Sequence, residues 1–373
     1  MECERKIRVL IIDDSAIVRR ILSDALASEP DLEVVGSAPD PYVARDKILS
    51  LCPDVLTLDI EMPRMDGLTF LKKLMQYHPL PTVVISSLAQ NSCRTAVEAL
   101  RLGAVEVLPK PGGAYSVGEL RNTLAHKIRA AATSRLHPPP TARSVPAAPR
   151  PAADCAVLPP GTVVAIGAST GGTEAIAAVL TRLPASTPGI VIAQHIPPEF
   201  SRAFANRLNE TCALEVREAR DGDTLRPGLA LVAPGDFHML LQKSAGSYSV
   251  RVKTGPRVCY QRPSVDVLFV SAAEAAGRDA VGVLLTGMGA DGAKGLLAMY
   301  RAGAYTIAQD EATCVVFGMP REAIALGAAE QVLPLDAIPA AILRTRDTDA
   351  SRGRGVRSSE APPPRSANKQ PLP

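Results

Sequence analysis

Tryptophan is absent from the 373-residue sequence, and aromatic residues make up only 3% of it. Proteins that bind single-stranded nucleic acid without sequence preference stack the bases on aromatic side chains. The scarcity of aromatic residues therefore argues against that class of protein. Hydrophobic residues (46%) and charged residues (21%) occur in the proportions of a folded chain. The length is sufficient for two domains that each bury a core.

The sequence also lacks a strong charge of either sign, because its formal net charge is only +3. Residues 1–131 and 161–344 each contain 16 Lys and Arg against 17 Asp and Glu. The small positive excess lies in the two segments between and after them, 132–160 and 345–373. A basic domain face is therefore not expected, and we predict no nucleic-acid partner.

Cysteine pairs, cysteine–histidine clusters and long apolar runs are missing as well. The seven cysteines occur singly, and an odd number fits no closed set of disulfides. This pattern favours free thiols in a reducing compartment. The longest uncharged stretch, 155–173, is interrupted by prolines and glycines, and no signal peptide is visible. We therefore expect a cytoplasmic protein with no direct membrane insertion.

Residues 1–131 alternate between short apolar runs and stretches with helical periodicity. The apolar runs predict strands, the periodic stretches predict helices, and the alternation predicts a parallel sheet covered on both faces. Five strands fit a flavodoxin-like, doubly wound α/β fold, whose sites lie beyond the carboxyl ends of the strands. The predicted strands are 8–12, 32–37, 54–58, 82–86 and 105–108, and the predicted helices include 16–27, 67–77, 92–102 and 116–131.

The composition changes at residues 132–160, where eight prolines stand among Ala, Ser and Thr. This segment predicts an extended, semi-rigid linker. Residues 161–345 alternate again, which predicts a second α/β parallel-sheet domain, and residues 346–373 are predicted to be a disordered tail. The predicted strands of the second domain are 162–166, 189–193, 229–233, 281–285 and 305–308, with a β-hairpin formed by 239–241 and 248–253.

Acidic and polar residues follow the predicted strands of the first domain. Asp13 and Asp14 end the first strand, and Asp59 ends the third. Ser86 ends the fourth strand, and Lys110 follows the fifth. The carboxyl ends of parallel strands meet at one edge of the sheet. Crowded carboxylates repel one another, and Mg²⁺ with oxygen ligands relieves that repulsion and leaves one carboxylate to accept a phosphoryl group. Helix capping would explain a single Asp, but not the whole set.

In the second domain, Gly-Ala-Ser-Thr-Gly-Gly at residues 167–172 follows a predicted strand and begins a helix. Such a turn either cradles a dinucleotide phosphate or presents Ser169 as a nucleophile. The glycine spacing is not Gly-x-Gly-x-x-Gly, and no acidic residue ends the next strand. The nucleophile interpretation is therefore favoured.

A histidine and an aspartate follow two other predicted strands, at His195 and Asp291. Together with Ser169 they supply a hydroxyl, an imidazole and a carboxylate, the groups of a serine hydrolase. The order Ser, His, Asp differs from the Ser, Asp, His order of the α/β-hydrolases. Each residue alone is explained as a cap, a structural histidine or a turn acid, but three strand ends together favour catalysis. His238, before the hairpin, is the rival imidazole.

Residues 7–131 resemble a two-component receiver domain. The resemblance implies that Asp59 is phosphorylated and that Mg²⁺ is held by Asp14 and Asp59, by Asp13 through water and by the carbonyl of Glu61. It also implies that Ser86 and Lys110 respond to the phosphoryl group, and that the peptide bond before Pro111 is cis. The matching segments are Leu-Ile-Ile-Asp-Asp at 10–14, Leu-Thr-Leu-Asp-Ile-Glu-Met-Pro at 56–63, Met-Asp-Gly at 65–67, Ser86 and Lys110-Pro111.

Residues 161–340 resemble the catalytic domain of chemotaxis protein-glutamate methylesterases. The resemblance implies a triad of Ser169, His195 and Asp291, and an oxyanion site formed by backbone donors near Thr170 and Met288. The matching segments are Ile-Gly-Ala-Ser-Thr-Gly-Gly at 166–172, Ala-Gln-His-Ile-Pro at 193–197, Leu-Val-Ala-Pro-Gly at 231–235, Arg-Pro-Ser-Val-Asp at 262–266 and Leu-Thr-Gly-Met-Gly-Ala-Asp-Gly at 285–292.

Both resemblances together imply a phosphorylation-activated serine hydrolase of bacterial chemotaxis. It would demethylate glutamate methyl esters on methyl-accepting chemotaxis receptors, release methanol and deamidate certain receptor glutamines. A chemotaxis histidine kinase would be the phosphodonor, and ester hydrolysis would need no cofactor. Two alternatives are a response regulator with a DNA-binding output domain and a receiver joined to a nucleotide-dependent enzyme. The near-neutral charge of 161–344 and its glycine spacing argue against them.

Overall fold

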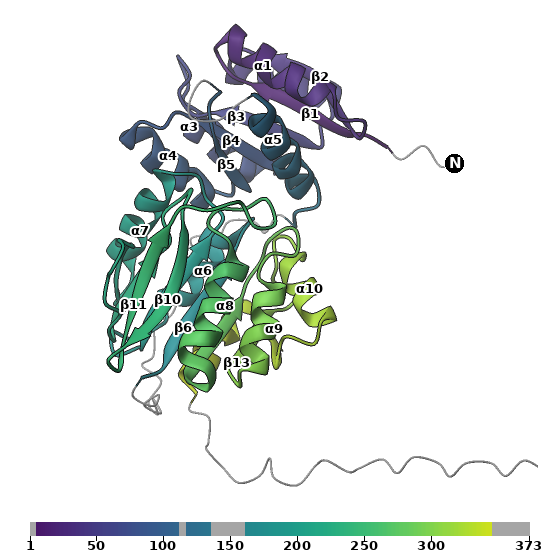
Figure 1. Ribbon diagram of the computed structural model, residues 1–373. Coiled ribbons are helices and arrows are strands. Elements are labelled where there is room, and N and C mark those ends of the chain that lie inside the picture. Colours follow the sequence, from purple (N-terminus) through teal and green to yellow (C-terminus); the bar gives the residue numbers. More distant parts are fainter. Residues whose placement is uncertain (1–4, 112–116, 136–160, 345–373) are drawn as a thin grey trace, which may run out of the picture.

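The structure is a computed structural model that describes residues 5–111, 117–135 and 161–344. These residues form two α/β domains, and the N-terminal domain packs on one end of the C-terminal domain (Figure 1). The predicted tail and all but the first four residues of the predicted linker lie outside the described residues.

The N-terminal domain is a five-stranded parallel sheet in the order β2-β1-β3-β4-β5. This order confirms the predicted flavodoxin-like arrangement. The strands are β1 Ile7–Ile12, β2 Leu32–Ala38, β3 Val55–Asp59, β4 Thr82–Ser86 and β5 Glu106–Pro109, and the helices are α1 Ala16–Ala27, α2 Pro41–Leu51, α3 Gly67–Tyr77, α4 Gln90–Arg101 and α5 Val117–Ala132.

The apolar alternation along β1 explains why helices cover both faces of this sheet. Val9 and Ile11 pack with residues of α1 and α5, whereas Leu10 and Ile12 pack with residues of α2, α3 and α4. Successive side chains of a strand point to opposite faces, so a continuous apolar run requires cover on both sides. The carboxylates of Asp13 and Asp14 follow directly after the last residue of this strand, Ile12.

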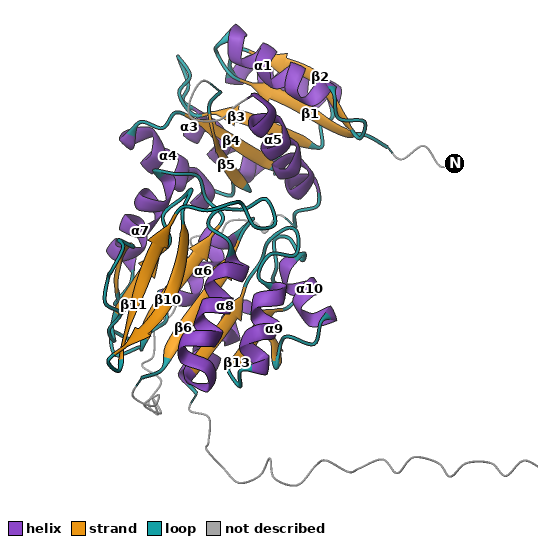
Figure 2. Ribbon diagram, viewed as in Figure 1, coloured by secondary structure: helices purple, strands orange, loops and turns teal. Residues whose placement is uncertain are grey.

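The C-terminal domain is a seven-stranded parallel sheet in the order β14-β13-β12-β6-β7-β9-β8, with a separate antiparallel hairpin, β10-β11 (Figure 2). Its strands are β6 Val163–Ala168, β7 Gly189–Gln194, β8 Glu215–Glu218, β9 Leu229–Val232, β10 His238–Ser244, β11 Ser247–Lys253, β12 Ala280–Leu284, β13 Tyr305–Gln309 and β14 Gln331–Leu333. Its α-helices are α6 Gly172–Leu180, α7 Phe200–Thr211, α8 Val265–Ala276, α9 Ala293–Arg301, α10 Met319–Ala325 and α11 Ile338–Leu343.

The sequence pattern did not predict the two edge strands of this sheet, β8 and β14. Both are short, at four and three residues, and neither is fully buried. Edge strands of this kind lack the continuous apolar run that identifies a central strand. The central strands lie where they were predicted, with ends that differ by one or two residues.

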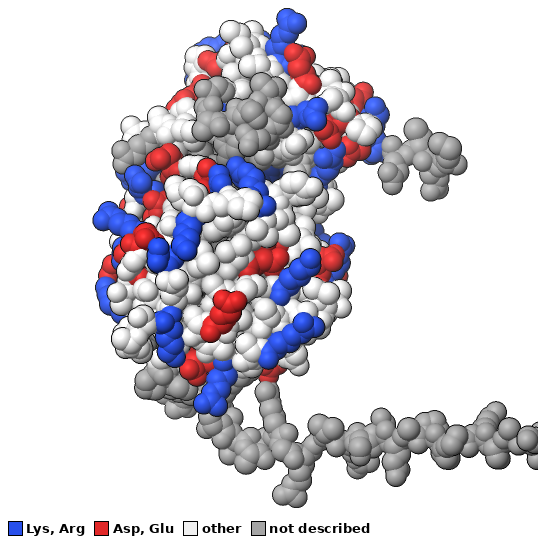
Figure 3. Space-filling model, in the orientation of Figure 1, with Lys and Arg blue, Asp and Glu red and all other residues white. Residues whose placement is uncertain are grey.

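The two domains share a buried apolar contact between α4 and α7. Val97 of α4 belongs to the same buried cluster as Phe204 of α7. At the edge of this contact Arg207 donates to the carbonyl of Val97 (3.5 Å) and forms an ion pair with Glu174. Basic and acidic side chains are interspersed over the face shown in Figure 3. This contact between α4 and α7 is therefore apolar, with a polar contact at its edge.

Candidate functional site

Ser169 lies in the sharp turn between β6 and α6, at the carboxyl end of the sheet. Gly171 has φ 74° and lets the chain turn directly into the helix. The backbone N–H of Ser169 donates to the carbonyl of Thr286 (3.0 Å). A Cβ atom on Gly287 would lie 2.7 Å from the Ser169 Cβ, so only glycine allows the loop after β12 to approach this closely. The turn is held against the neighbouring strand end by small residues.

His195 and Asp291 form a buried pair beside this turn. His195 Nε2 lies 2.8 Å from Asp291 Oδ2, and both side chains are 2% exposed. The backbone N–H of His195 donates to the carbonyl of Ala168 (3.1 Å), which holds the histidine next to the end of β6. The other ring nitrogen, Nδ1, is buried and has no hydrogen-bond partner among the described residues. This nitrogen is therefore free to accept a proton, and it makes no hydrogen bond with the Ser169 hydroxyl in this structure.

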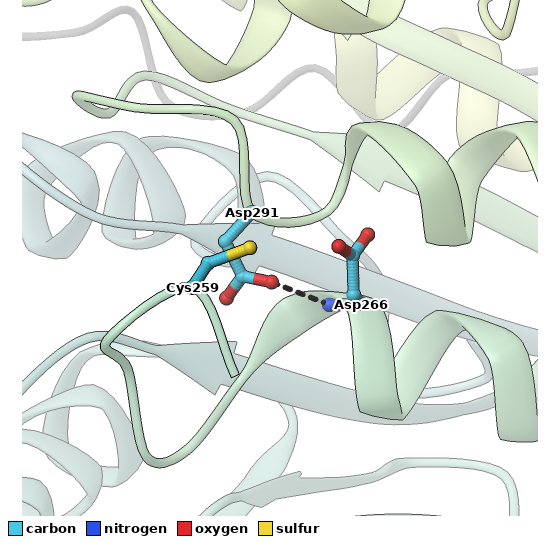
Figure 4. Close-up of side chains that lie close together, drawn as sticks. All are labelled: Cys259, Asp266 and Asp291. Carbon is cyan, nitrogen blue, oxygen red and sulfur yellow. Dashed lines mark hydrogen bonds between the residues drawn. The ribbon is translucent and has the colours of Figure 1, made fainter. Parts of the chain in front are cut away.

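The carboxylate of Asp291 is anchored at the N-terminus of α8. It accepts hydrogen bonds from the Ser264 hydroxyl (2.8 Å) and from the backbone N–H groups of Val265 (2.8 Å) and Asp266 (3.0 Å) (Figure 4). Burial raises the pKa of Asp291, but the His195 ring and these N–H groups outweigh it and hold the pKa below its ordinary value. The residues that anchor Asp291 were not identified from the sequence, although they lie in the matching segment at 262–266.

Cys259 and Asp266 lie beside Asp291, with one possible ligand atom of each within 4.8 Å of the others (Figure 4). Asp291 already accepts the hydrogen bonds described above, and Asp266 accepts one from the backbone N–H of Gly295 (2.6 Å). Burial and the two neighbouring carboxylates raise the pKa of the Cys259 thiol. Hydrogen bonds thus account for the positions of both carboxylates.

His238, the rival imidazole, has both ring nitrogens occupied by the backbone. Nε2 lies 2.9 Å from the carbonyl of Pro256, and Nδ1 accepts a hydrogen bond from the N–H of Ser264 (3.2 Å). Neither nitrogen is available as a base. His238 instead holds the segment that leads into α8, so its role is structural.

The two residues expected near the oxyanion lie on loops that Thr286 ties together. Thr286 donates through its hydroxyl to the carbonyl of Thr170 (3.0 Å) and accepts from the N–H of Val316 (3.0 Å). Thr170 follows Ser169 directly, and Met288 lies on the loop whose Gly287 faces Ser169. Both backbones therefore border the nucleophile turn.

The acidic pocket of the N-terminal domain brings three carboxylates and one lysine close together. One carboxylate oxygen each of Asp13, Asp14 and Asp59 lies within 4.8 Å of the others. Lys110 Nζ is 2.7 Å from Asp59 Oδ2 and 3.9 Å from Asp13 Oδ2. Burial and the charge of Asp59 raise the pKa of Asp13 to about 6, and burial raises the pKa of Asp59 despite its contact with Lys110.

These residues fit a hard divalent cation. Asp13 Oδ2 is buried without a hydrogen-bond partner among the described residues, and three crowded carboxylates lower their mutual repulsion by sharing a cation. Glu61 contributes a backbone N–H to Asp59 (3.0 Å), and its side chain accepts a hydrogen bond from the Ser92 hydroxyl instead of entering the pocket.

Ser86 and the peptide bond before Pro111 complete this pocket. The Ser86 hydroxyl, which is expected to turn toward Asp59 only after phosphorylation, donates to the carbonyls of Ser92 (3.4 Å) and Ser87 (3.5 Å). Among the described residues the cis peptide bond is Arg262–Pro263, and the expected cis bond before Pro111 is absent. Ser86 thus faces α4, on the side of the domain contact.

Comparisons with known proteins identify the family of each domain. Residues 164–342 match the CheB methylesterase family, and residues 9–122 match the response regulator receiver domain. The chain is 53% identical over 339 residues, 91% of its length and 99% of the relative, to "Protein-glutamate methylesterase/protein-glutamine glutaminase 2" of Syntrophus aciditrophicus. The chain belongs to this family.

Two further members are similarly close. The chain is 52% identical to the Pseudomonas aeruginosa protein "Protein-glutamate methylesterase/protein-glutamine glutaminase 2" and 50% identical to the Salmonella typhimurium protein "Protein-glutamate methylesterase/protein-glutamine glutaminase". Each match covers 94% of this chain and 99% of the relative. The receiver and the methylesterase domain of the family thus occur here in the same order. None of the described helices has the length and apolar character that crossing a membrane requires.

The receiver covers the methylesterase site in this structure. A cavity of about 440 Å³ between the domains is lined from the receiver by His126 and Lys127, and from the methylesterase domain by His195, Arg257 and Tyr260. Burial and the nearby Lys127 lower the pKa of His126 to about 4. The side chain of Ser169 is buried. A large molecule cannot reach Ser169 in this arrangement.

Proposed function

We propose that this chain hydrolyses glutamate methyl esters on methyl-accepting chemotaxis receptors, releases methanol and deamidates receptor glutamines to glutamate. The observation that carries the proposal is the His195–Asp291 pair beside the Ser169 turn. The names of the relatives supply the substrate class, since they are protein-glutamate methylesterases and protein-glutamine glutaminases. Hydrolysis requires only a nucleophile, a base and oxyanion donors, so we expect it to need no cofactor.

In the proposed reaction Ser169 Oγ attacks the ester carbonyl carbon and His195 Nδ1 accepts the hydroxyl proton. The tetrahedral intermediate expels methoxide, which takes that proton from the imidazolium and leaves as methanol. A water molecule then attacks the acyl-enzyme and regenerates Ser169. The orientation of His195 supports Nδ1 as the base, because Nε2 is engaged by Asp291. With a glutamine substrate the leaving group is ammonia.

Asp291 stabilises the imidazolium that forms in each step. Its lowered pKa keeps the carboxylate charged at neutral pH, so that it can face the imidazolium. The developing negative charge on the substrate oxygen is stabilised by backbone N–H groups near Thr170 and Met288.

We propose that Asp59 accepts a phosphoryl group from a chemotaxis histidine kinase. Asp14 and Asp59, together with Asp13 through water and the carbonyl of Glu61, would hold Mg²⁺, which neutralises charge on the transferred group. Lys110 already contacts Asp59 and would pair with a phosphoryl oxygen. Ser86 would turn inward toward that group, away from its present acceptors.

Phosphorylation would weaken the packing of the receiver over the catalytic site, a shift between closed and open populations. Domain contacts that are partly polar are compatible with a shift of ~1–3 kcal/mol, or roughly 5–150-fold in activity. We assign the receiver to residues 1–131, the linker to 132–160, the methylesterase domain to 161–345 and the tail to 346–373. The proposed location is the cytoplasm, where the kinase and the receptor substrates would be met.

The experiment is methanol release from methylated receptor membranes, measured with and without a phosphodonor. We expect release that rises with phosphodonor and is absent in Ser169→Ala. Release by Ser169→Ala at the wild-type rate would refute the assigned nucleophile. Lack of any release by folded, phosphorylated protein would refute the proposed substrate.

A further inference from the structure

Glu106 of the receiver reaches directly into the nucleophile turn of the methylesterase domain. Its Oε1 accepts a hydrogen bond from the hydroxyl of Thr170, the residue that follows Ser169. The same oxygen lies 2.7 Å from Lys127 Nζ of α5. All three residues are buried: Glu106 is 5% exposed, Lys127 7% and Thr170 1%.

Domain packing alone does not call for a carboxylate at this point. Burial of a charged carboxylate is costly, and an apolar side chain of similar size would serve the contact at least as well. At the edge of the α4–α7 contact, Arg207 donates to the backbone carbonyl of Val97, and its side chain remains partly exposed to solvent. Glu106 is different, because its side chain contacts the residue that follows Ser169 in an enzyme whose product is a glutamate side chain.

We infer that Glu106 is a built-in product mimic: its γ-carboxylate occupies the position beside Ser169 where the γ-carboxyl group of the receptor glutamate binds. The Thr170 hydroxyl, which Glu106 now occupies, is then a positioning group for the substrate carbonyl and for the product carboxylate. The inference rests on the proposed function for the identity of the product. The proposed ligand of the subsite is thus a glutamyl side chain, supplied by the receptor in the open enzyme and by the receiver in the closed enzyme.

Lys127 makes the mimic reversible. It neutralises Glu106 within the receiver, so both members of the ion pair leave the site together when the receiver moves away. Glu106 also lies on the strand that leads to Lys110, four residues further along. A pull of the phosphoryl group on Lys110 therefore acts on the same strand that inserts Glu106.

The test compares full-length variants without phosphodonor, with the rate at which a fluorophosphonate probe labels Ser169 as the readout. Glu106→Ala and Glu106→Gln should label at least about fivefold faster than wild type. Glu106→Asp, which keeps the charge but shortens the side chain, should also label faster. The matched control is Arg207→Ala, which removes a domain contact away from Ser169 and should have a smaller effect. Thermal unfolding checks that each variant is folded.

A second readout separates product mimicry from simple obstruction. N-acetyl-glutamate α-amide, a soluble analogue of the product, should slow the labelling of Glu106→Ala at millimolar concentration and leave wild type unchanged. Adding Thr170→Val to Glu106→Ala should remove this protection, and Thr170→Ser should retain it. A residue that only blocked access would not create a binding site for the analogue when it is removed.

The inference is overturned if Glu106→Ala and Arg207→Ala label equally fast, or if the analogue does not protect Glu106→Ala. Methanol release from receptor membranes is measured in parallel. If phosphorylated wild type releases no methanol while the labelling rates follow the expected order, the proposed substrate is wrong and the carboxylate subsite stands. If no variant is labelled at all, Ser169 is not the nucleophile and both proposals fail.

Discussion

The Asp291 site and the acidic pocket around Asp59 occupy equivalent places in their two domains, but the pKa of a carboxylate is lowered in the first and raised in the second. Both lie at the carboxyl ends of parallel strands, where the sheet edge collects polar residues. Asp291 accepts hydrogen bonds from Ser264, Val265 and Asp266, and its pKa is lowered. Asp13 keeps a buried oxygen without a hydrogen-bond partner among the described residues, and its pKa is raised to about 6.

Under the proposed function, this difference separates a carboxylate that is held ready for ester hydrolysis from one that waits for a cation. Fixed donors hold Asp291 charged and oriented, as a group that assists every turnover must be. Fixed donors in the acidic pocket would compete with a cation and a phosphoryl group that arrive and leave. The pocket therefore retains unfavourable charge, which a bound ligand relieves.

Substitution in the catalytic site should have the largest effect. Ser169→Ala and His195→Ala are expected to reduce methanol release by ~10⁶-fold, and Asp291→Asn by ~10⁴-fold, because triad members act as a unit. The folded state should persist in Ser169→Ala, as judged by circular dichroism. An inactive His238→Ala beside an active His195→Ala would reverse the assignment of the base.

Removal of the phosphoacceptor should abolish labelling without touching the catalytic site. Asp59→Asn is expected to take up no label from acetyl phosphate or phosphoramidate, and chelation of Mg²⁺ should prevent uptake by wild type. Asp291→Asn is the matched control, since it changes a buried carboxylate of the other site, and it should be labelled normally. Rapid labelling of Asp59→Asn would show that the acceptor lies elsewhere.

Separation of the two domains should have an intermediate effect. A fragment of residues 155–345 is expected to release methanol roughly 5–150-fold faster than the unphosphorylated full chain, and to ignore phosphodonor. The physical reason is that β5 and α5 of the receiver no longer cover Ser169. A folded fragment that is no faster than the full chain would show that the receiver activates by direct contact.

The smallest effect concerns stability and directly contrasts the two carboxylates. In EDTA, Asp13→Asn should stabilise the protein at pH 7.5 by about 1–3 kcal/mol, because it removes one charge from a crowded pocket. Asp291→Asn should destabilise it, because a well-bonded carboxylate is lost. Thermal unfolding measures the stability of both variants. A change of the same sign in both would contradict the proposed difference between the two carboxylates.

The sign of the pH dependence follows from the raised pKa of Asp13. The pKa of Asp13 is about 6 in the folded state, whereas the ordinary pKa of a free aspartate is 3.8. The folded state thus binds more protons between these values, and stability without metal should rise as the pH falls from above 6 toward 4. Asp13→Asn should flatten this part of the curve.

Much of the fold was predictable because local signals agree with the tertiary structure. The helices 16–27 and 67–77 have the predicted ends, since Ser15 and Asp66 accept hydrogen bonds from backbone N–H groups of the first turn. The central strands were predicted correctly because their continuous apolar runs agree with burial on both faces of a parallel sheet. The edge strands β8 and β14 were missed because their sequences carry no such signal.

Strand periodicity and turn residues are local properties of the chain, so they locate the chemical groups that stand at the strand ends. These local patterns indicate Ser169, His195 and Asp291, and the acidic residues around Asp59. They do not indicate which imidazole nitrogen of His195 is free, because that depends on hydrogen bonds between segments almost a hundred residues apart.

The placement of Glu106 against Thr170 was likewise invisible in the sequence. These residues are 64 positions apart and belong to different domains, and each looks ordinary in its own segment. No periodicity or motif records how one folded surface meets another, since the contact is formed by elements that are already complete. The chemistry of the site is therefore a local property of the chain, whereas its accessibility is a property of the assembled molecule.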